Sequence, residues 1–135
     1  MQLLFNYKTL LFIPFLLLLS YGTISAQSSL IENAKTALKT GSSKALAGYL
    51  NEMVELSING DKSSYSKTQA EFVLKDFFKK YPPTGFDYIH QGSSKEGLKY
   101  TIGKYKYSGG SFRVYMLIKQ FKGKYLIDTL NFDKE

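Results

Sequence analysis

The sequence predicts an α+β domain in which helices pack on a curved antiparallel sheet. Between residues 29 and 81 the apolar residues recur mainly at helical spacing, with one short hairpin between the helices. From residue 86 to the end they alternate along the chain, as they do in strands. The turns between these last strands are short and contain glycine, so we expect neighbouring strands to run antiparallel.

The chain opens with the features of a secretory signal peptide. One lysine, Lys8, precedes an apolar run from Leu10 to Leu19, and the small-residue stretch Thr23–Ala26 follows. The run is shorter than the roughly 18 to 20 residues that a membrane span needs, so an uncleaved anchor is the alternative interpretation. We expect cleavage after residue 26, which leaves residues 27–135 as one small periplasmic or secreted domain.

The composition excludes several classes of site. The chain has no cysteine and one histidine, which removes disulfides, thiolate metal sites, thiol nucleophiles and histidine-rich zinc sites. It also lacks a phosphate-binding Gly-Lys-Ser/Thr loop and a nucleophile elbow, so we expect no metal and no cofactor. The formal net charge is +7, and every cationic residue except Arg113 is a lysine. Because lysine suits loose attraction better than bidentate phosphate recognition, we attribute the charge to solubility and expect no nucleic-acid partner.

Two helices are predicted after the leader. Ser29 and Glu32 have the spacing of a capping box at the start of a helix with one apolar stripe. Gly41 is expected to end that helix. A second, short helix fits residues 43–50.

A hairpin and a third helix follow. Residues 54–58 alternate between apolar and polar side chains, and Asn59-Gly60 is a strong signal for a tight hairpin turn. Ser66 and Gln69 form a second capping box, and Pro82-Pro83 is expected to end the helix behind it.

Four more strands are predicted, over residues 86–91, 98–107, 111–121 and 124–132. We expect them to form an antiparallel meander. On a regular strand, Tyr100 and Ile102 of the second segment would point to one face of the sheet, whereas Tyr105 and Tyr107 would point to the other. The facing of this strand is therefore expected to change near Gly103, at a bulge.

The order of these elements and two segments resemble a known architecture. The stretches Tyr65–Phe78 and Gly109–Phe132 are similar to a family of small exported bacterial proteins with a cystatin-like, nuclear-transport-factor-two-like fold. The resemblance implies a curved sheet that wraps the helices into a cone. That superfamily includes isomerases and dehydratases with an aspartate, tyrosine or histidine inside the cone, and many members that only bind ligands or proteins. Its catalytic motifs have no counterpart here, so the resemblance implies a pocket and no particular reaction.

The only histidine, His90, is the first catalytic candidate, because an imidazole titrates near neutral pH. On a regular strand it shares a face with Phe86 and Tyr88, and Tyr100 of the next strand could lie on that face. The alternative interpretation is a hydrogen-bonded or solvated histidine at the end of a strand.

Asp128 is the second catalytic candidate. Its parity matches that of Leu130 and Phe132, so a core built from those residues would bury the carboxylate and raise its pKa. If the opposite face, with Ile127, is the buried one, Asp128 lies in water. A contact between His90 and Asp128 would form an acid–base dyad.

The ligand-binding candidates are Tyr88, His90, Tyr100 and Arg113. The lone arginine could grip a carboxylate or phosphate of a ligand, or it could pair with an acidic neighbour such as Glu96 or Asp128. The many strand tyrosines either pack in the core or line a pocket or a sugar-stacking face.

These observations predict an exported, non-enzymatic domain that binds a small, partly apolar ligand or a partner protein in or on the cone. One alternative is a small isomerase- or hydrolase-like enzyme that uses His90 or Asp128. Another is a structural module that forms a homodimer through the outer face of the sheet near Tyr115, Leu117 and Phe121.

Overall fold

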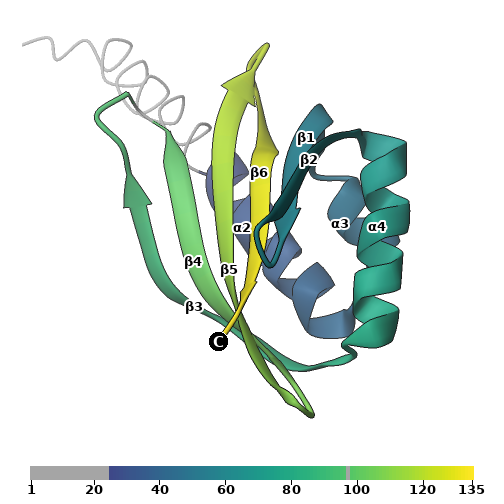
Figure 1. Cartoon of the computed structure of the whole chain (residues 1–135). Coiled ribbons are helices and arrows are strands. Elements are labelled where there is room, and N and C mark those ends of the chain that lie inside the picture. Colours follow the sequence, from purple (N-terminus) through teal and green to yellow (C-terminus); the bar gives the residue numbers. More distant parts are fainter. Residues whose placement is uncertain (1–24, 97) are drawn as a thin grey trace, which may run out of the picture.

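The computed structural model describes residues 25–96 and 98–135 (Figure 1). In this part of the chain the helices are α2 (Ser25–Thr40), α3 (Ser43–Ala47) and α4 (Lys67–Lys80). The strands are β1 (Leu50–Ile58), β2 (Asp61–Ser66), β3 (Pro83–Ser93), β4 (Lys99–Tyr107), β5 (Gly110–Phe121) and β6 (Lys124–Lys134). The predicted leader lies outside the described residues, apart from Ser25 and Ala26, which begin α2. Within the described ranges no helix combines the length and the apolar character that crossing a membrane requires.

The strands form one six-stranded sheet in the order β2-β1-β6-β5-β4-β3. Strands β3 to β6 make the predicted antiparallel meander, and β1 with β2 makes the predicted hairpin. Strands β1 and β6 join these two parts as a parallel pair, which the sequence did not predict. A parallel pair needs a long connection, and the four intervening strands with α4 provide it. The predicted α+β class, with helices on a curved and mainly antiparallel sheet, is confirmed.

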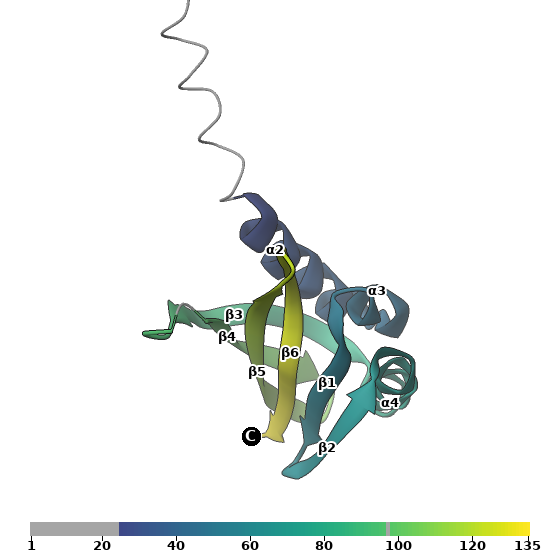
Figure 2. The same cartoon turned by 90° about the horizontal axis from the view of Figure 1, so that it is seen from above.

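The sheet curves around the helices, which lie against its inner face (Figure 2). α2 packs against β3 and β6, whereas α4 packs against β1 and β2. β3 has an extra residue between Tyr88 and His90, where it pairs with β4. β6 has an extra residue opposite Leu117 and Ile118 of β5. Such bulges place an extra residue in one strand and bend it, so they contribute to the curvature.

The first two helices need corrections at their ends. α2 begins at Ser25, so Ser29 lies inside the helix and does not cap it. The end of α2 is as predicted, because Gly41 follows it with a φ of 68°. α3 ends at Ala47, and Leu50 already belongs to β1 rather than to the predicted helix.

The start and end of α4 are as predicted. Ser66 Oγ accepts a hydrogen bond from the Gln69 N–H at 3.2 Å, and Gln69 Oε1 accepts one from the Ser66 N–H at 3.1 Å. This reciprocal pair satisfies two backbone donors that the first helical turn leaves free. The helix ends at Lys80, before Pro82-Pro83.

The predicted change of facing in β4 is wrong. Thr101, Gly103 and Tyr105 are all buried, so the same parity faces the core along this strand. The bulge lies next to Gly103 but on the neighbouring strand, where Ile89 is the extra residue of β3. A Cβ atom at position 103 would lie 2.7 Å from Cε2 of Phe86, so glycine makes room there for a core ring.

Phe77 lies at the centre of an aromatic cluster between α4 and the sheet. Its ring centroid is 4.3 Å from that of Phe132 and 5.0 Å from that of Phe112. Tyr105 completes this group, and all four side chains are buried. Aromatic rings therefore fill the space between α4 and the sheet around Phe77.

Candidate functional site

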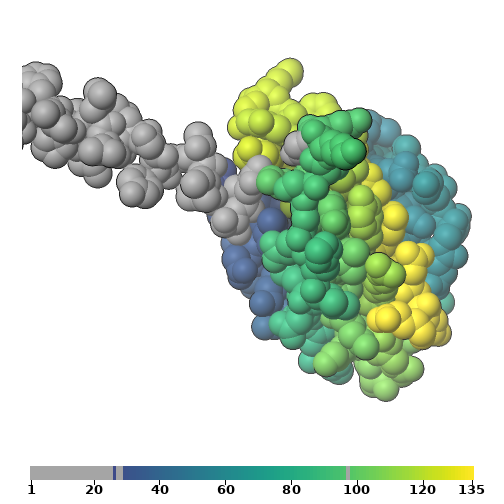
Figure 3. Space-filling view, turned by 90° about the vertical axis from the view of Figure 1, so that its left-hand side faces the viewer, coloured from purple at the N-terminus to yellow at the C-terminus, as the bar shows by residue number. Residues whose placement is uncertain are grey.

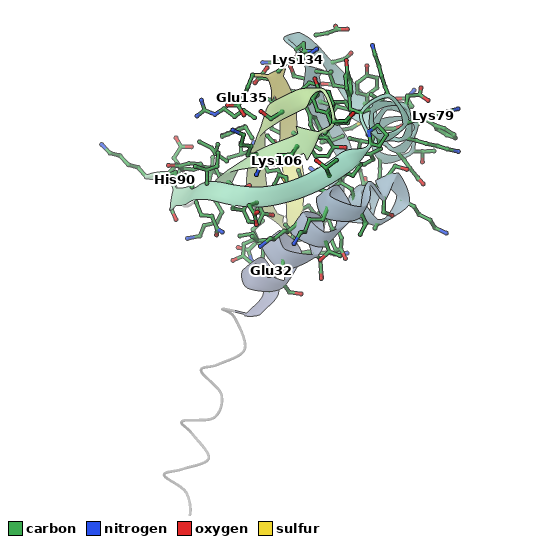
Figure 4. The ribbon with its side chains drawn as sticks, turned by 90° about the horizontal axis from the view of Figure 1, so that it is seen from below. Glu32, Lys79, His90, Lys106, Lys134 and Glu135 are labelled. Carbon is green, nitrogen blue, oxygen red and sulfur yellow. The ribbon has the colours of Figure 1, made fainter. Side chains whose placement is uncertain are left out.

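The bulge at Ile89 turns His90 to the outer face of the sheet. Side chains alternate along a regular strand, and one extra residue reverses the alternation. Phe86 is buried and Tyr88 points toward α2, whereas His90 is exposed. The prediction that His90 shares their face is therefore wrong. Figure 4 shows His90 toward the end of β3, on the opposite side of the view from Lys79 on α4.

On the outer face His90 joins two tyrosines. Its Nε2 atom lies 3.1 Å from the Tyr100 hydroxyl, a hydrogen bond whose direction depends on the histidine tautomer. The Tyr100 and Tyr115 rings stack, with centroids 6.3 Å apart and planes 27° apart. We call His90, Tyr100 and Tyr115 the outer aromatic row. It runs across β3, β4 and β5, with one side chain from each strand.

Gly92 allows Tyr100 to reach His90. The two residues Gly92 and Tyr100 are paired across β3 and β4. A Cβ atom at position 92 would lie 2.5 Å from both the Cζ and the hydroxyl oxygen of Tyr100. The glycine therefore leaves space for the phenol to lie across β3, as aromatic rings do over glycines in sheets.

Apolar and polar groups surround the outer aromatic row. Ile102 and Leu117 are half-buried on the same face, in register with Tyr115 and Tyr100 respectively. On the β6 side, the Oδ1 atom of Asn131 is buried without a hydrogen-bond partner, and this residue pairs with Tyr115. A buried acceptor of this kind is uncommon, and its burial keeps it out of reach of a ligand on the sheet surface.

Arg113 lies on the same face, one row further along β5. It is exposed and is in register with Lys104 on β4 and Asp133 on β6. Among the described residues no acidic side chain forms an ion pair with it, so the predicted pairing with Glu96 or Asp128 does not occur.

Tyr88 is separate from this group. Its hydroxyl donates to the Ile31 carbonyl at 2.6 Å and so ties β3 to α2. Burial, together with the nearby charge of Glu32, raises the pKa of the Tyr88 phenol well above its ordinary value. The structure therefore brings His90 and Tyr100 together, places Arg113 nearby, and leaves Tyr88 in a structural contact.

Asp128 lies at the second bulge and is not in the core. Its Oδ2 atom is 3.0 Å from Nζ of Lys119, and its Oδ1 accepts a hydrogen bond from Asn51 at 3.4 Å. Its side chain is 23% exposed, whereas Ile127 is buried. Asp128 is therefore not buried in the core with Leu130 and Phe132.

His90 and Asp128 do not form a dyad. Strands β4 and β5 lie between their two strands, which is a separation of about 14 Å at about 4.8 Å per strand. Each side chain is engaged elsewhere, His90 with Tyr100 and Asp128 with Lys119. Within residues 25–96 and 98–135, no group of three or more histidine, aspartate and glutamate side chains could hold a metal ion.

Sequence reasoning did not select Tyr115, Gly92 or Asn131 for this site. Tyr115 was considered as part of a dimer surface and, with the other strand tyrosines, as part of the core or of a pocket or sugar-stacking face. Its stacking on Tyr100 depends on the register of β4 and β5, which the sequence does not specify. The one available signal was the pair of tyrosines on neighbouring strands with the same outward parity.

Comparisons with known proteins identify relatives of the same fold. The profile of a family described as a domain of unknown function, DUF4783, matches residues 31–133. A crystal structure of a DUF4783 family protein from Bacteroides ovatus is 32% identical, with a TM-score of 0.72; the match covers 76% of this chain and 93% of that one. No curated protein sequence matches the chain.

Two more distant crystal structures share the fold alone. A domain of unknown function with a cystatin-like fold from Nostoc punctiforme is 10% identical, with 86% of this chain and 79% of that chain covered and a TM-score of 0.65. An NTF-2 like protein of unknown function from Silicibacter pomeroyi is 13% identical, with 83% and 95% covered and a TM-score of 0.60. The resemblance predicted from the sequence is confirmed. The chain therefore belongs to the DUF4783 family, whose function is unknown and whose fold is cystatin-like and NTF2-like.

Proposed function

We propose that this chain is an exported, non-catalytic domain that binds a small, partly apolar ligand on the outer aromatic row. The stacked pair of Tyr100 and Tyr115 is the observation that carries the proposal. Half-exposed aromatic rings on a sheet face offer an apolar surface with polar hydroxyl handles.

A saccharide ring is the ligand class that fits this surface best. One face of a sugar ring is made of C–H groups, which pack on an aromatic ring, and its hydroxyls donate and accept hydrogen bonds. His90 and the Tyr100 hydroxyl can exchange hydrogen bonds with such hydroxyls. Arg113 adds a guanidinium without an ion-pair partner, which would favour a sugar acid.

The first experiment is a screen of neutral and acidic oligosaccharides against residues 25–135, followed by titration with nuclear magnetic resonance. We expect shifts at residues around Tyr100 and Tyr115. Tyr100→Ala and Gly92→Ala should weaken binding at least tenfold, the first by removing the ring and the second by displacing it. Phe72→Ala is the matched control, because Phe72 is an exposed ring on α4. A protein that binds no saccharide, or equal losses in the control, would refute the ligand class.

Native mass spectrometry of the same fragment separates ligand binding from self-association. A monomer that carries a sugar supports the proposal. A dimer that Tyr115→Ala dissociates would instead assign the outer face to a homodimer, and a bound protein would assign it to a partner. The enzymatic alternative has less support, because His90 and Asp128 are apart and each has a structural partner.

Export is the second part of the proposal, and it rests on the leader at residues 1–26. Cleavage after Ala26 would remove the first two residues of α2. Expression of the full chain in a bacterial host should give a periplasmic or secreted product whose first residue is Gln27, as found by N-terminal sequencing. Ala26→Phe should block processing, because the signal peptidase requires a small residue at the cut. A full-length cytoplasmic product would contradict export.

A further inference from the structure

The exposed large apolar side chains of the described residues lie on four different elements. Strand directions place the start of β1, the end of β3, the β5–β6 turn and the start of α4 at the same end (Figure 1). Met53 lies near the start of β1, Phe121 ends β5, Ile89 lies in the later half of β3, and Phe72 lies in the second turn of α4. Their exposed fractions are 56%, 44%, 64% and 64%, in that order. Ile89 on the edge strand β3 and Phe72 on α4, which packs at the other edge of the sheet, do not form one patch with Phe121.

The β5–β6 turn presents one of these groups between lysines. Phe121 pairs with Lys124, and the two residues between them, Lys122 and Gly123, have φ values of 48° and 79°. Two consecutive positive φ angles are typical of a tight two-residue hairpin turn, which holds the flanking side chains in fixed positions. We call Phe121–Lys124 the lysine tip. It projects from the body of the protein, in yellow-green in Figure 3.

An open groove of about 410 Å³ lies beside the lysine tip. Phe121 and Leu126 provide apolar walls, and Lys122 and Lys124 provide two ammonium groups. Glu52 is the acidic side chain in the lining, and Asn51 completes it. The combination of an exposed aromatic ring, an apolar wall and flanking lysines has the chemistry of a membrane–water interface.

The start of the described chain lies at the same end of the molecule. Ala26 of α2 lines a hollow of about 300 Å³ together with Gly123 and Lys124. The apolar run Leu10–Leu19 precedes it in the sequence. Under the export proposed above, on which this step rests, that run holds the chain at the membrane until cleavage after Ala26, so at that stage the lysine tip belongs to the end of the domain nearest to the lipid.

We propose that the lysine tip docks on an anionic lipid surface, with Phe121 among the headgroups and Lys122 and Lys124 against lipid phosphates. A four-residue tip is too small for a stable protein–protein contact, which buries about 1,600 Å² in total. Lysine, as a flexible point charge, suits a fluid layer of headgroups better than a fixed bidentate partner.

Residues 25–135 can be tested by themselves, because the matching protein from Bacteroides ovatus, 93% of which is covered by 76% of this chain, is a folded domain. Sedimentation with vesicles of phosphatidylglycerol and phosphatidylcholine should retain the protein, whereas vesicles of phosphatidylcholine alone should not. Each lysine contributes about a fivefold gain near an anionic surface, so Lys122→Ala/Lys124→Ala should lower the partition coefficient roughly 10- to 30-fold. The matched control is Lys79→Ala/Lys106→Ala, which removes the same charge from exposed positions at the other end (Figure 4).

A fluorescence measurement locates the contact. The chain has no tryptophan, so Phe121→Trp introduces a single reporter at the tip. We expect its emission to shift to shorter wavelength on phosphatidylglycerol vesicles and to be quenched by brominated lipid. Lys106→Trp places the same reporter on β4 away from the tip, and its emission should not change.

Three results would overturn the docking proposal. They are a lack of retention by phosphatidylglycerol vesicles, equal losses in the tip and control lysine variants, and equal emission shifts at positions 121 and 106. Failure of export would show itself separately, as an unprocessed cytoplasmic chain, without affecting vesicle binding by residues 25–135. The two proposals can therefore fail independently.

Discussion

Two glycines of this protein decide where two aromatic rings lie. Gly103 on β4 leaves space for the Phe86 ring in the core, and Gly92 on β3 leaves space for the Tyr100 ring on the outer face. Neither glycine has a positive φ, so space rather than backbone conformation is the reason for its presence. The sequence drew attention to Gly103 but assigned it the wrong role, because the ring that needs the space comes from the neighbouring strand.

Gly103→Ala should destabilise the protein by about 1 to 3 kcal/mol, because the new methyl group overpacks the core against Phe86. Urea unfolding measures this change in the free energy of unfolding. Gly85→Ala is the matched control: its added Cβ would meet only the Lys106 side chain, at 4.0 Å. We expect that variant to lie within about 0.5 kcal/mol of the parent protein. Equal losses in the free energy of unfolding at positions 85 and 103 would show that the loss of a strand glycine, and not the contact with Phe86, causes the effect.

Two buried phenols should make stability fall at alkaline pH. Burial raises the pKa of Tyr105, and burial with the charge of Glu32 raises that of Tyr88, both well above the ordinary value of about 10. Above pH 10 the unfolded chain therefore releases protons that the folded protein retains. The stabilising contribution is complete below about pH 10 and is lost as the pH rises beyond it.

The test is urea unfolding at about pH 8, 10 and 11. The Tyr88→Phe/Tyr105→Phe variant should be less stable at pH 8, by about 1 kcal/mol for each lost hydrogen bond to a backbone carbonyl. Its stability should nevertheless decline less steeply between pH 10 and 11. A decline as steep as that of the parent protein would exclude these phenols as the cause.

At the scale of elements, the sequence predicted the caps and turns that depend only on residues close together in the chain. The capping box of α4, the glycine after α2 and the tight turn at Asn59-Gly60 are local, and all are present. The bulges at Ile89 and Asp128 depend on the facing strand, and no residue type marks them. Parity arguments assume regular strands, so the bulge at Ile89 reversed the expected facing of His90, and the bulge at Asp128 allows Ile127, Leu130 and Phe132 all to be buried.

The candidate site illustrates the same limit. The contact between His90 and Tyr100 was expected from strand order, and it occurs, but on the outer face. Tyr115 and Asn131 join it only because the registers of β4, β5 and β6 bring them into line. The net charge and the number of aromatic residues can be read from the sequence. Which of these residues lie next to one another depends on the register of the strands, and the sequence does not specify it.

Ser66→Ala should destabilise the protein by about 1 kcal/mol, since the Gln69 N–H at the start of α4 would lose its capping acceptor. Ser64→Ala provides the comparison, because Ser64 is an exposed serine on the same strand. Its effect should be within about 0.5 kcal/mol. Thermal or urea unfolding of the two variants side by side measures the difference, and similar losses would argue against the cap.

At the scale of the whole molecule, one cluster of aromatic rings joins the helical layer to the sheet. Phe77 and Tyr81 come from α4 and its end, and Tyr105, Phe112 and Phe132 come from three different strands. The helical and alternating patterns were sufficient to predict this fold class, because both point to one shared core. They did not predict which aromatic rings would meet at its centre.

Phe77→Ala should cost about 3 to 5 kcal/mol, because it removes a buried ring that contacts residues of α4, β4, β5 and β6. A domain of this size has only about 5 to 15 kcal/mol of stability, so the variant should be close to unfolding at 37 °C. Phe72→Ala removes the same side chain from the same helix, but Phe72 is 64% exposed whereas Phe77 is 4% exposed. We expect the Phe72 variant to change the free energy of unfolding by no more than about 0.5 kcal/mol. Urea unfolding with comparison of the slopes tests both, and comparable losses would mean that burial of Phe77 in the aromatic cluster is not the cause of the effect.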